Sequence, residues 1–459
     1  MRKLMVLCSL AALVLLSAFI NRFTGDKPVP IPASPQRTGD AKKGYDYLVT
    51  GDYVRSGLPY QVFLFGAGAN TNNYLRREGI NKNISHEFTA VTAPNGEVLV
   101  APNCLQCHAQ VFDGKLIVGL GNSLVDFTKN EKLNPASLEM LGKMLQARSP
   151  KQYEAALPFL TVTKAISPYL NAPVKGVNVA DHLAALLVAH RNPMTFGWSD
   201  DWMLEKPAVL VPTDTPPWWL LKKKNAMFYN GFGRGDFGRF LMASNLLTVN
   251  DTSESRVVDE HMPDVLSYIY SLQPPKYPGT VNAALAAKGK AVFQTNCSGC
   301  HGSYGAKSTY PNLLIPESIV GTDSLLYKSN YSAPQFVSWF NKSWFTMGSH
   351  PARLEPFNGY IAPPLDGIWV SAPYLHNGSV PTLEALLDSK LRPVYWSRDF
   401  DHPQYDLEHV GWKFATEAGP GTSSVYNTTA AGYGNYGHYF GDALTATERK
   451  SVIEYLKTL

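Results

Sequence analysis

The residues with the clearest chemistry are two cysteines followed by a histidine in the order C-x-x-C-H, and this pattern occurs twice. The first copy spans residues 104–108 (CLQCH) and the second spans residues 297–301 (CSGCH). In such a motif two thiols, three positions apart, form thioethers with porphyrin vinyl groups, and the adjacent histidine ligates the iron. The spacing predicts two covalently bound haem c groups, and the residues that would hold them are Cys104, Cys107, His108, Cys297, Cys300 and His301.

Two other interpretations of the motif are half a zinc site and a redox-active C-x-x-C pair. A zinc site needs further cysteines or closely spaced histidines, and none follow either copy. A thioredoxin-like pair explains neither the adjacent histidine nor the repetition. The pattern therefore favours His108 and His301 as proximal iron ligands.

Composition describes a folded protein that is large enough for two domains. The chain has 459 residues, a hydrophobic content of 45% and a charged content of 17%. A net charge of +4 is too small to indicate a nucleic-acid partner. Four of the five cysteines belong to the two motifs and the fifth is Cys8, so no pair remains for a structural disulfide. Haem attachment of this kind nevertheless indicates an oxidising compartment.

The N-terminus resembles an export signal. A short positive region, residues 1–3, precedes an uncharged apolar run over residues 4–20, and no clear cleavage site follows. We expect residues 1–20 to be an uncleaved signal anchor that holds the protein on the periplasmic side of the bacterial inner membrane. The alternative is a cleaved signal, which would leave a soluble periplasmic or secreted protein. Residues 21–84 then form an N-terminal extension, with a proline-rich tether at residues 27–36.

The elements that position the first motif begin with a β-hairpin. Alternating residues 87–92 and 97–100 flank Asn95-Gly96, which is a strong turn signal, and the second strand leads directly to Cys104. The first motif therefore lacks the usual leading helix. Helical spacing continues over residues 135–191.

Three further segments complete the first haem domain, residues 85–273. The Pro-Pro-Trp-Trp segment at 216–219 predicts a rigid, poorly helical turn. The glycine-rich segment at 231–236 predicts a tight loop rather than a dinucleotide-binding motif, because no strand precedes it. Residues 261–272 have helical spacing.

The second haem domain, residues 281–459, follows a proline-rich linker at 274–280. An alanine-rich helix over 283–294 leads into Cys297, and a capping box at Thr445 begins a helix that runs to Leu459. That last helix aligns with residues 261–272, which indicates an internal duplication. The fold class that we predict is mainly α, with two cytochrome c-like domains, the first of them elaborated with a β-hairpin and extra helices and loops.

One stretch carries a family resemblance. Residues 362–383 read APPLDGIWVSAPYLHNGSVPTL. This stretch resembles a segment of the bacterial di-haem cytochrome c peroxidase superfamily, which includes the methylamine-dehydrogenase maturation enzyme. The LHNGSVP run, the Pro-Pro-Trp-Trp turn and the late YGHYFG run (436–441) look closer to its rubber-oxygenase-like branch. The resemblance spans most of the chain beyond residue 85, and implies two haems close enough for electron transfer.

The resemblance also implies the second ligand of the second haem. Where the peroxidases have a ligating methionine, this chain has Lys390. The rubber-oxygenase-like branch uses a late histidine in a G-H-x-x-G setting, which His438 matches. We therefore expect His301 and His438 to be the axial ligands, with His376 packing nearby without ligating. The alternatives are that His438 is a surface loop residue, or that the ligand is one of three rivals: His402, His409 and Met347.

For the first haem, the resemblance implies the site where peroxide or dioxygen reacts. Such chemistry needs an open or weakly held sixth position. His182 and His190 lie on an apolar helix, where a histidine is more often a core residue than a ligand. Arg234 and Asp236 are weak candidates for acid–base catalysis. The remaining candidates in this part of the chain, which we expect to serve packing, are Met194, Met227 and Met242.

Two segments beside these ligands have open roles. Trp218 and Trp219 either relay electrons between the haems, as an inter-haem tryptophan does in the resembled enzymes, or form aromatic core. The lysines at 222–224 are either a solvated face or the counter-charge of a haem propionate. A calcium ion bridges the domains in some of the resembled peroxidases, but no residue pattern here supports one.

These observations leave three functions open. The first is an exported redox enzyme, peroxidase- or oxygenase-like, in which the first haem activates peroxide or dioxygen towards an organic substrate and the second transfers electrons. Its electron partner would be a redox protein or a quinol-linked carrier. The second is a non-catalytic electron-transfer cytochrome with two six-coordinate haems. The third is a maturation enzyme that oxidises a protein partner.

Overall fold

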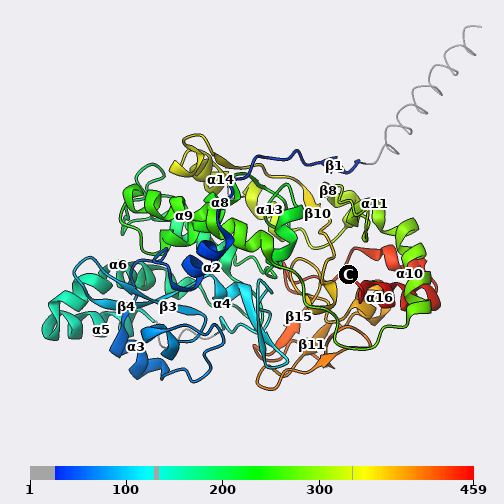
Figure 1. The fold of residues 1–459 in the computed structure, drawn as a ribbon, viewed down its shortest axis with the longest axis horizontal. Helices are drawn as coiled ribbons and strands as arrows, with labels where there is room; N and C mark the ends of the chain where they lie inside the picture. The colour runs from blue at the N-terminus through cyan, green and yellow to red at the C-terminus, as the bar shows by residue number, and fades with distance from the viewer. Residues whose placement is uncertain (1–25, 129–133, 333) are drawn as a thin grey trace, which may run out of the picture.

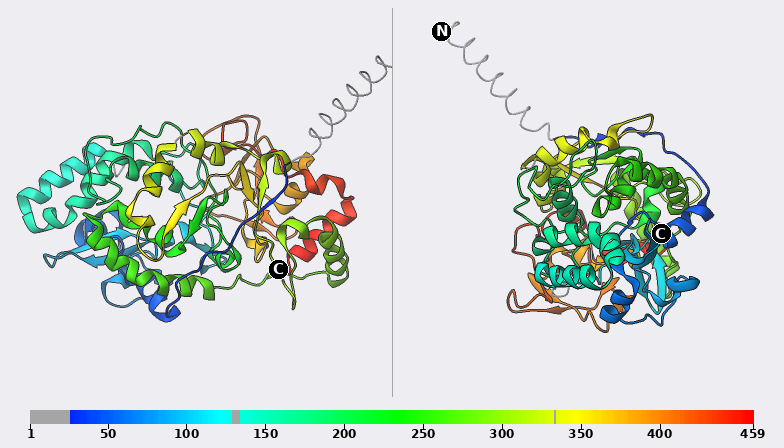
Figure 2. Two further views of the ribbon diagram at one scale, coloured as in Figure 1. Left: turned by 90° about the horizontal axis from the view of Figure 1, so that it is seen from above. Right: turned by 90° about the vertical axis from the view of Figure 1, so that its left-hand side faces the viewer.

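The computed structural model describes residues 26–128, 134–332 and 334–459, so the predicted signal anchor lies outside the described residues. Helices make up 41% and strands 13% of the structure. The expectation of a mainly α fold is therefore only partly correct, because six small antiparallel sheets stand among the helices. The protein is elongated, with α5 and α6 at one end and α10 and α16 at the other (Figures 1 and 2).

Helices occur on both sides of the domain boundary that we predict at residue 273. Those up to residue 273 are α2 (Ala41–Thr50), α3 (Tyr60–Ala67), α4 (Leu105–His108), α5 (Pro135–Arg148), α6 (Pro150–Ile166), α7 (Ala180–Ala189), α8 (Phe237–Leu241) and α9 (Thr252–Ser271). Those that follow are α10 (Ala283–Asn296), α11 (Ser298–His301), α12 (Glu317–Val320), α13 (Leu325–Ser332), α14 (Pro334–Asn341), α15 (Leu383–Leu387) and α16 (Ala446–Leu456). The 3-10 segments used below are η3 (Trp218–Lys223), η4 (Met242–Leu247) and η8 (Tyr439–Ala443).

The sheets have two or three short strands each. Those before the second motif contain β2 (Leu58–Pro59), β4 (Val98–Pro102) and β3 (Phe88–Thr92), then β5 (Ala109–Phe112) with β6 (Lys115–Val118). Those that join distant segments are β1 (Val29–Pro30) with β8 (Leu313–Pro316) and β10 (Gly359–Ile361), and β7 (Gly233–Gly235) with β9 (Ala352–Leu354). The others are β14 (Ala415–Thr416), β11 (Tyr395–Ser397) and β15 (Val425–Asn427), and β12 (Tyr405–Asp406) with β13 (Gly411–Trp412).

The predicted hairpin is confirmed. Strands β3 and β4 pair in the register Val91↔Leu99, and β4 ends at Pro102, immediately before the first motif. The helix after residue 283 and the capping box at Thr445 are also confirmed, since α10 runs into the second motif and Glu448 accepts from the Thr445 backbone. Two expectations were wrong in detail. α9 begins nine residues earlier than predicted, at Thr252, and part of the glycine-rich loop at 231–236 forms β7.

The two halves share one helix crossing. Gly44 of α2 lies against Asp264 and Val265 of α9, where an added Cβ would be 2.0 Å from the Asp264 carbonyl oxygen. Gly289 of α10 lies against Ser451 and Val452 of α16, where an added Cβ would be 1.8 Å from the Ser451 carbonyl oxygen. The sequence alignment of the last helices pairs Val265 with Val452. Helix α2 therefore has the position in the first half that the leading helix α10 has in the second half. Unlike α10, however, α2 is separated from its motif by a long insertion before Cys104.

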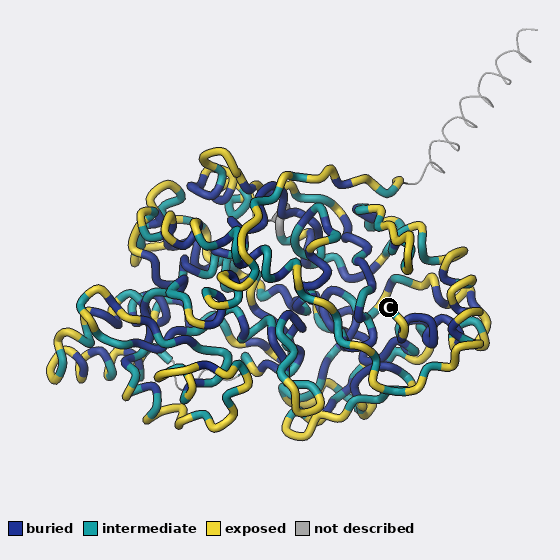
Figure 3. Tube along the Cα trace, in the orientation of Figure 1, coloured by how far each residue is buried: buried dark blue, intermediate teal, exposed yellow. Residues whose placement is uncertain are grey.

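Buried residues run through the interior of both halves (Figure 3), and the hydrophobic cores of the two halves share residues. The larger cluster packs α2, α6, α7 and α9 together and also takes in Trp339 to Leu354 from the second half. The smaller cluster packs α10, α15 and α16 and takes in Leu120, Trp219 and Leu220 from the first half. The segment around η3 thus contributes to both cores.

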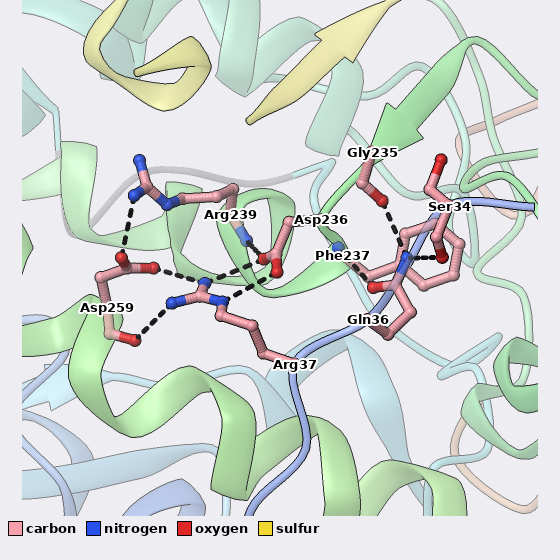
Figure 4. A network of polar contacts seen from close by, with 8 residues as sticks. All are labelled: Ser34, Gln36, Arg37, Gly235, Asp236, Phe237, Arg239 and Asp259. Atoms are coloured by element: carbon pink, nitrogen blue, oxygen red, sulfur yellow. Dashed lines mark hydrogen bonds and ion pairs between the residues drawn. The ribbon is translucent and has the colours of Figure 1, made fainter. Parts of the chain in front are cut away.

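The proline-rich segment is extended, but it is not a free tether. Residues Val29–Pro30 pair with β8, and Gln36 hydrogen bonds to Gly235 and Phe237. Arg37 binds the carboxylate of Asp236 through two nitrogens, at 2.8 and 2.9 Å, and that of Asp259 at 2.7 Å (Figure 4). The segment is docked along the folded body because these buried acidic groups need its cation.

Within residues 26–128, 134–332 and 334–459, no helix combines the length and the apolar character that a bilayer span requires.

Candidate haem sites

Both motifs form the same tight turn. In α4 the amide of His108 donates to the carbonyl of Cys104 at 3.0 Å, and in α11 the amide of His301 donates to Cys297 at 3.0 Å. The helical turn brings the two thiols of each motif to one side, with the histidine beside them. Each motif therefore has the local backbone that double thioether attachment requires.

The surroundings of the thiols disfavour the two alternative interpretations. Burial raises the pKa of Cys107 and of Cys297 to about 11, and it also raises the pKa of Cys104 and Cys300. A redox-active pair instead needs a thiol with a lowered pKa. Zinc needs further ligands, and within the described residues no group of three or more His, Cys, Asp or Glu side chains is placed to hold a metal ion.

A cavity of about 230 Å³ opens beside the second motif. Cys297, Cys300 and His301 form part of its wall, and the opposite part includes His438. Helices α10 and α16 close one side, because Phe293, Val452 and other apolar residues face the space. The cavity is mostly apolar, as a buried porphyrin requires.

His301 and His438 both line this cavity and lie next to each other, with an angle of 61° between their ring planes. Their ring centroids are 6.2 Å apart. A metal ion held by two imidazole nitrogens at about 2.0–2.1 Å separates the ring centres by about 6.3 Å, since each centre lies about 1.1 Å behind its nitrogen. The observed spacing therefore fits an iron between the two rings.

The environment keeps both rings in the form that ligates metals. The Nδ1 atom of His301 is 2.8 Å from the carbonyl oxygen of Pro363, which fixes the ring and leaves the other nitrogen for iron. Burial lowers the pKa of His301, and burial, His301 and Arg392 lower the pKa of His438 to about 3. Neutral imidazole is the ligand form. The Nδ1 atom of His438 is buried without a hydrogen-bond partner among the described residues.

Local backbone geometry places His438. The residue has φ = 50°, and it directly precedes η8. Gly437 before it has φ = 78° and lies so close to Gly321 that an added Cβ would be 2.3 Å from the Gly321 carbonyl carbon. The His438 amide donates to Val320 at 2.7 Å. A glycine is required before the histidine because no side chain fits there.

The rival ligands lie elsewhere. His402 and His409 are partly or fully exposed and sit beside Asp399 and Asp406. Met347 is 45% exposed, and Lys390 is exposed. None of these four is in the lining of the cavity. His376 does line it, with its Nε2 atom 3.0 Å from the Tyr360 hydroxyl.

The first motif has a different neighbour. The His108 ring stacks on Trp218, with centroids 4.4 Å apart and an angle of 17° between the planes. Burial lowers the pKa of His108 to about 3, and its Nδ1 atom has no hydrogen-bond partner among the described residues. Among the described residues, the aromatic ring that contacts His108 is that of Trp218. The first motif therefore has no histidine in the position that His438 has beside His301 at the second motif.

Segment η3 connects the two motifs. Trp218 contacts His108, and the adjacent Trp219 donates from Nε1 to the carbonyl of Asp366 at 2.8 Å. Asp366 lines the cavity at the second motif, and it stands three residues beyond Pro363 in the chain. Of the lysines that follow, Lys222 is exposed, whereas Lys223 and Lys224 are not part of a solvated face. Lys223 binds both carboxylate oxygens of Asp366 at 2.7 Å, and Lys224 is buried with its pKa lowered to about 8 by burial.

The two acid–base candidates have structural partners. Asp236 caps α8 through the amide of Arg239 and binds Arg37 (Figure 4). Arg234 is buried in β7, where its Nε atom lies 3.6 Å from the Glu355 carboxylate, and its Nε and Nη1 atoms have no hydrogen-bond partner among the described residues. Neither is in the lining of the cavity at the second motif.

The remaining histidine and methionine candidates are mostly core residues. His190 stacks on Trp198 at 4.7 Å, and its Nδ1 atom is 2.9 Å from the Ser199 carbonyl oxygen. His182 is buried. Met242 and Met227 belong to the larger core, whereas Met194 is exposed.

The sequence analysis did not identify the polar residues that line the cavity at the second motif. Asp214, Tyr229 and Tyr360 line it from segments that are far apart in the chain. Pro363 belongs to the resembled stretch at residues 362–383, but no sequence pattern indicates that its carbonyl oxygen contacts His301. Asp366 stands in the same stretch and was not singled out.

Comparison with known proteins identifies cytochrome c-like segments in the second half of the chain. Residues 286–355 match the cytochrome c family, and residues 359–397 match a family described as RoxA-like, cytochrome c-like. Two proteins of Sinorhizobium fredii (strain NBRC 101917 / NGR234) are similar, both with the description uncharacterized protein. One, y4iM, is 28% identical over 302 residues, which is 55% of this chain and 66% of the relative. The other, y4iJ, is 29% identical over 253 residues, which is 41% of each chain.

The aligned regions thus cover less than two thirds of either relative's length. The chain contains cytochrome c domains, one of them RoxA-like, and such domains imply covalently bound haem c. The cytochrome c match includes the second motif, and the RoxA-like match includes the segment that holds Pro363, Asp366 and His376.

Proposed function

We propose that this protein is an exported di-haem c-type cytochrome that acts as a redox enzyme of the peroxidase or oxygenase type. Cys104 and Cys107 hold the first haem, and Cys297 and Cys300 hold the second. The observation that carries the proposal is the His301–His438 pair at the second motif, with ring centroids 6.2 Å apart, whereas His108 of the first motif stacks on Trp218 and has no facing histidine among the ring contacts of the described residues. Two unlike haem sites suit an enzyme better than two equivalent electron carriers.

The residues of the second site serve electron transfer. An iron with two imidazole ligands exchanges electrons without binding substrate. The carbonyl of Pro363 orients His301, and the tight Gly437–Gly321 contact fixes His438. Rigid ligands keep the reorganisation of the site small when its charge changes.

The first site is the one that we assign to chemistry, because no histidine faces His108 among the ring contacts of the described residues. A bound haem with a free position would supply peroxide or dioxygen activation. His108 provides the fixed side, held against Trp218. Trp218 stacks on His108, and its chain neighbour Trp219 donates a hydrogen bond to Asp366, which lines the cavity at the second motif. This connection supports an electron relay between the two sites. The substrate would be an organic molecule, and electrons would pass to or from a redox protein or a quinol-linked carrier.

The resemblance beyond residue 85 and the RoxA-like match support the oxygenase-like form of this proposal. The alternative, a non-catalytic carrier, is favoured by the docked N-terminal segment, which would hold both sites close to a membrane if residues 1–20 anchor the chain.

The test combines mass and spin state. The denatured protein should carry the mass of two haems, and the oxidised protein should show one high-spin and one low-spin iron by electron paramagnetic resonance. Replacement His438→Ala should convert the low-spin signal to high spin, whereas the control His409→Ala should leave it unchanged. One haem per chain, or a low-spin signal that survives in His438→Ala, would refute the assignment. Two low-spin irons that do not bind carbon monoxide after reduction would favour the carrier.

A further inference from the structure

Two carboxylates line the cavity at the second motif, and their surroundings differ. Both oxygens of Asp366 are 2.7 Å from Nζ of Lys223. Asp214 lines the same cavity, but among the described residues no lysine or arginine nitrogen lies within 4 Å of its carboxylate. One carboxylate therefore has its own counter-charge and the other does not.

The groups that face Asp214 come from four segments. The Tyr229 hydroxyl donates to its Oδ2 atom at 3.2 Å, and its own amide donates to the carbonyl of His376 at 2.7 Å. His376 is neutral, because burial lowers its pKa to about 3. Tyr426 and Arg398 lie further off and interact with the Asp214 charge through space.

Arg398 stands behind Asp214 in a buried aromatic setting. Its guanidinium lies over Phe400 at 4.7 Å and over Trp412 at 5.1 Å, and it donates to the Ser123 carbonyl. Its Nε and Nη1 atoms have no hydrogen-bond partner among the described residues. This cation attracts the Asp214 carboxylate but does not pair with it, and burial raises the pKa of Asp214 to about 7 in spite of Tyr229, Thr215 and Arg398.

We propose that Asp214 is a proton acceptor that responds to the redox state of the second haem, so that reduction of this site is accompanied by proton uptake. The inference rests on the proposed function. In the step, a one-electron donor reduces ferric iron to ferrous iron, and the Asp214 carboxylate takes a proton from solvent to become a carboxylic acid. Oxidation reverses both changes.

The physical reason is charge balance in a low-dielectric cavity. One added electron makes the space more negative, and this favours protonation of a nearby unpaired carboxylate. The ion pair of Asp366 with Lys223 has no such response, since its charges already cancel.

The sign of the pH dependence follows. Burial raises the pKa of Asp214 to about 7, and an electron added to the cavity should raise it further. The midpoint potential of the second haem should therefore be level well below pH 7 and fall as pH rises above it. A tenfold difference in proton affinity between the two redox states corresponds to about 59 mV for a one-electron couple.

The experiment is a spectroelectrochemical titration of the full di-haem protein between about pH 5 and about pH 9, a range that brackets the raised carboxyl pKa. The low-spin haem of the wild type should show the slope. Asp214→Asn, which preserves shape and hydrogen bonding, should abolish it. The matched control Asp366→Asn removes a carboxylate from the same cavity, and should move the potential while retaining the slope.

A slope that persists in Asp214→Asn places the proton on another group, such as a haem propionate, and overturns the proposal. A wild-type midpoint potential that does not change with pH also overturns the proposal. If Asp214→Asn fails to fold, redox-difference infrared spectra of the wild type decide: a protonated carboxyl band must appear on reduction, and its absence refutes the idea. If covalent haem or a reversible one-electron response is missing, the proposed function fails instead.

Discussion

The helix crossing at Gly289 gives the most direct test of how packing builds the second site. Replacement Gly289→Ala adds a Cβ that would lie 1.8 Å from the carbonyl oxygen of Ser451 and 2.3 Å from its carbonyl carbon. Both are backbone atoms of α16, so they cannot rotate away as a side chain does. The two helices must separate, and their facing residues Phe293 and Val452 line the cavity.

The magnitude is a difference between two terms. Overpacking a well-packed interface costs about 1–3 kcal/mol, and contact with backbone favours the upper half of that range. Alanine in place of glycine inside a helix returns about 0.5–1 kcal/mol. We expect Gly289→Ala to lower the free energy of unfolding by about 1–2.5 kcal/mol, measured by urea denaturation followed by haem absorbance.

The control is Gly66→Ala in α3, where an added Cβ meets nothing within 4 Å. It should raise stability by about 0.5–1 kcal/mol. Gly44→Ala, at the matching crossing of α2 and α9, should behave like Gly289→Ala. If Gly289→Ala and Gly66→Ala shift the unfolding midpoint in the same direction, the packing argument is wrong.

Two other predictions concern the N-terminal segment and the tryptophan relay. Arg37→Met should lower the free energy of unfolding by about 3–5 kcal/mol, because it leaves the Asp236 carboxylate, whose side chain is 2% exposed, without its cation. The control Lys42→Ala, which breaks the exposed pair with Asp46, should change it by less than about 0.5 kcal/mol; equal effects in urea denaturation would contradict this account. Trp218→Leu should slow electron equilibration between the two haems after a flash or rapid-mixing reduction. Trp198→Leu removes a stack of the same geometry from His190 and should leave that rate unchanged, so equal slowing would argue against the relay.

Much of the second site was readable because its signals are local. The C-x-x-C-H spacing, the helix before Cys297 and the capping box at Thr445 each depend on residues a few positions apart. The YGHYFG run pointed to His438 for the same reason, since Gly437 and His438 form one turn. Whether that turn faces His301 depends on residues more than a hundred positions away.

Errors arose where partners are distant in the chain. The lysine run left two roles open, a solvated face or a counter-charge, because Asp366, the partner of Lys223, is 143 positions away. The glycine-rich segment at 231–236 looked like a loop because the strand that pairs with it, β9, begins at Ala352. The proline-rich segment looked like a tether because its acidic partners, Asp236 and Asp259, follow some 200 residues later.

The sequence by itself determined the chemistry that is available: four thiols and two histidines at the spacing of haem attachment, and a late histidine preceded by a glycine. Thioether spacing is covalent and local, so no fold is needed to recognise it. Only the tertiary structure decided which histidine faces His301, which carboxylate of the cavity lacks a cation, and that Trp218 lies against His108. These are contacts between segments far apart in the chain, and they form only when α2 crosses α9 and α10 crosses α16.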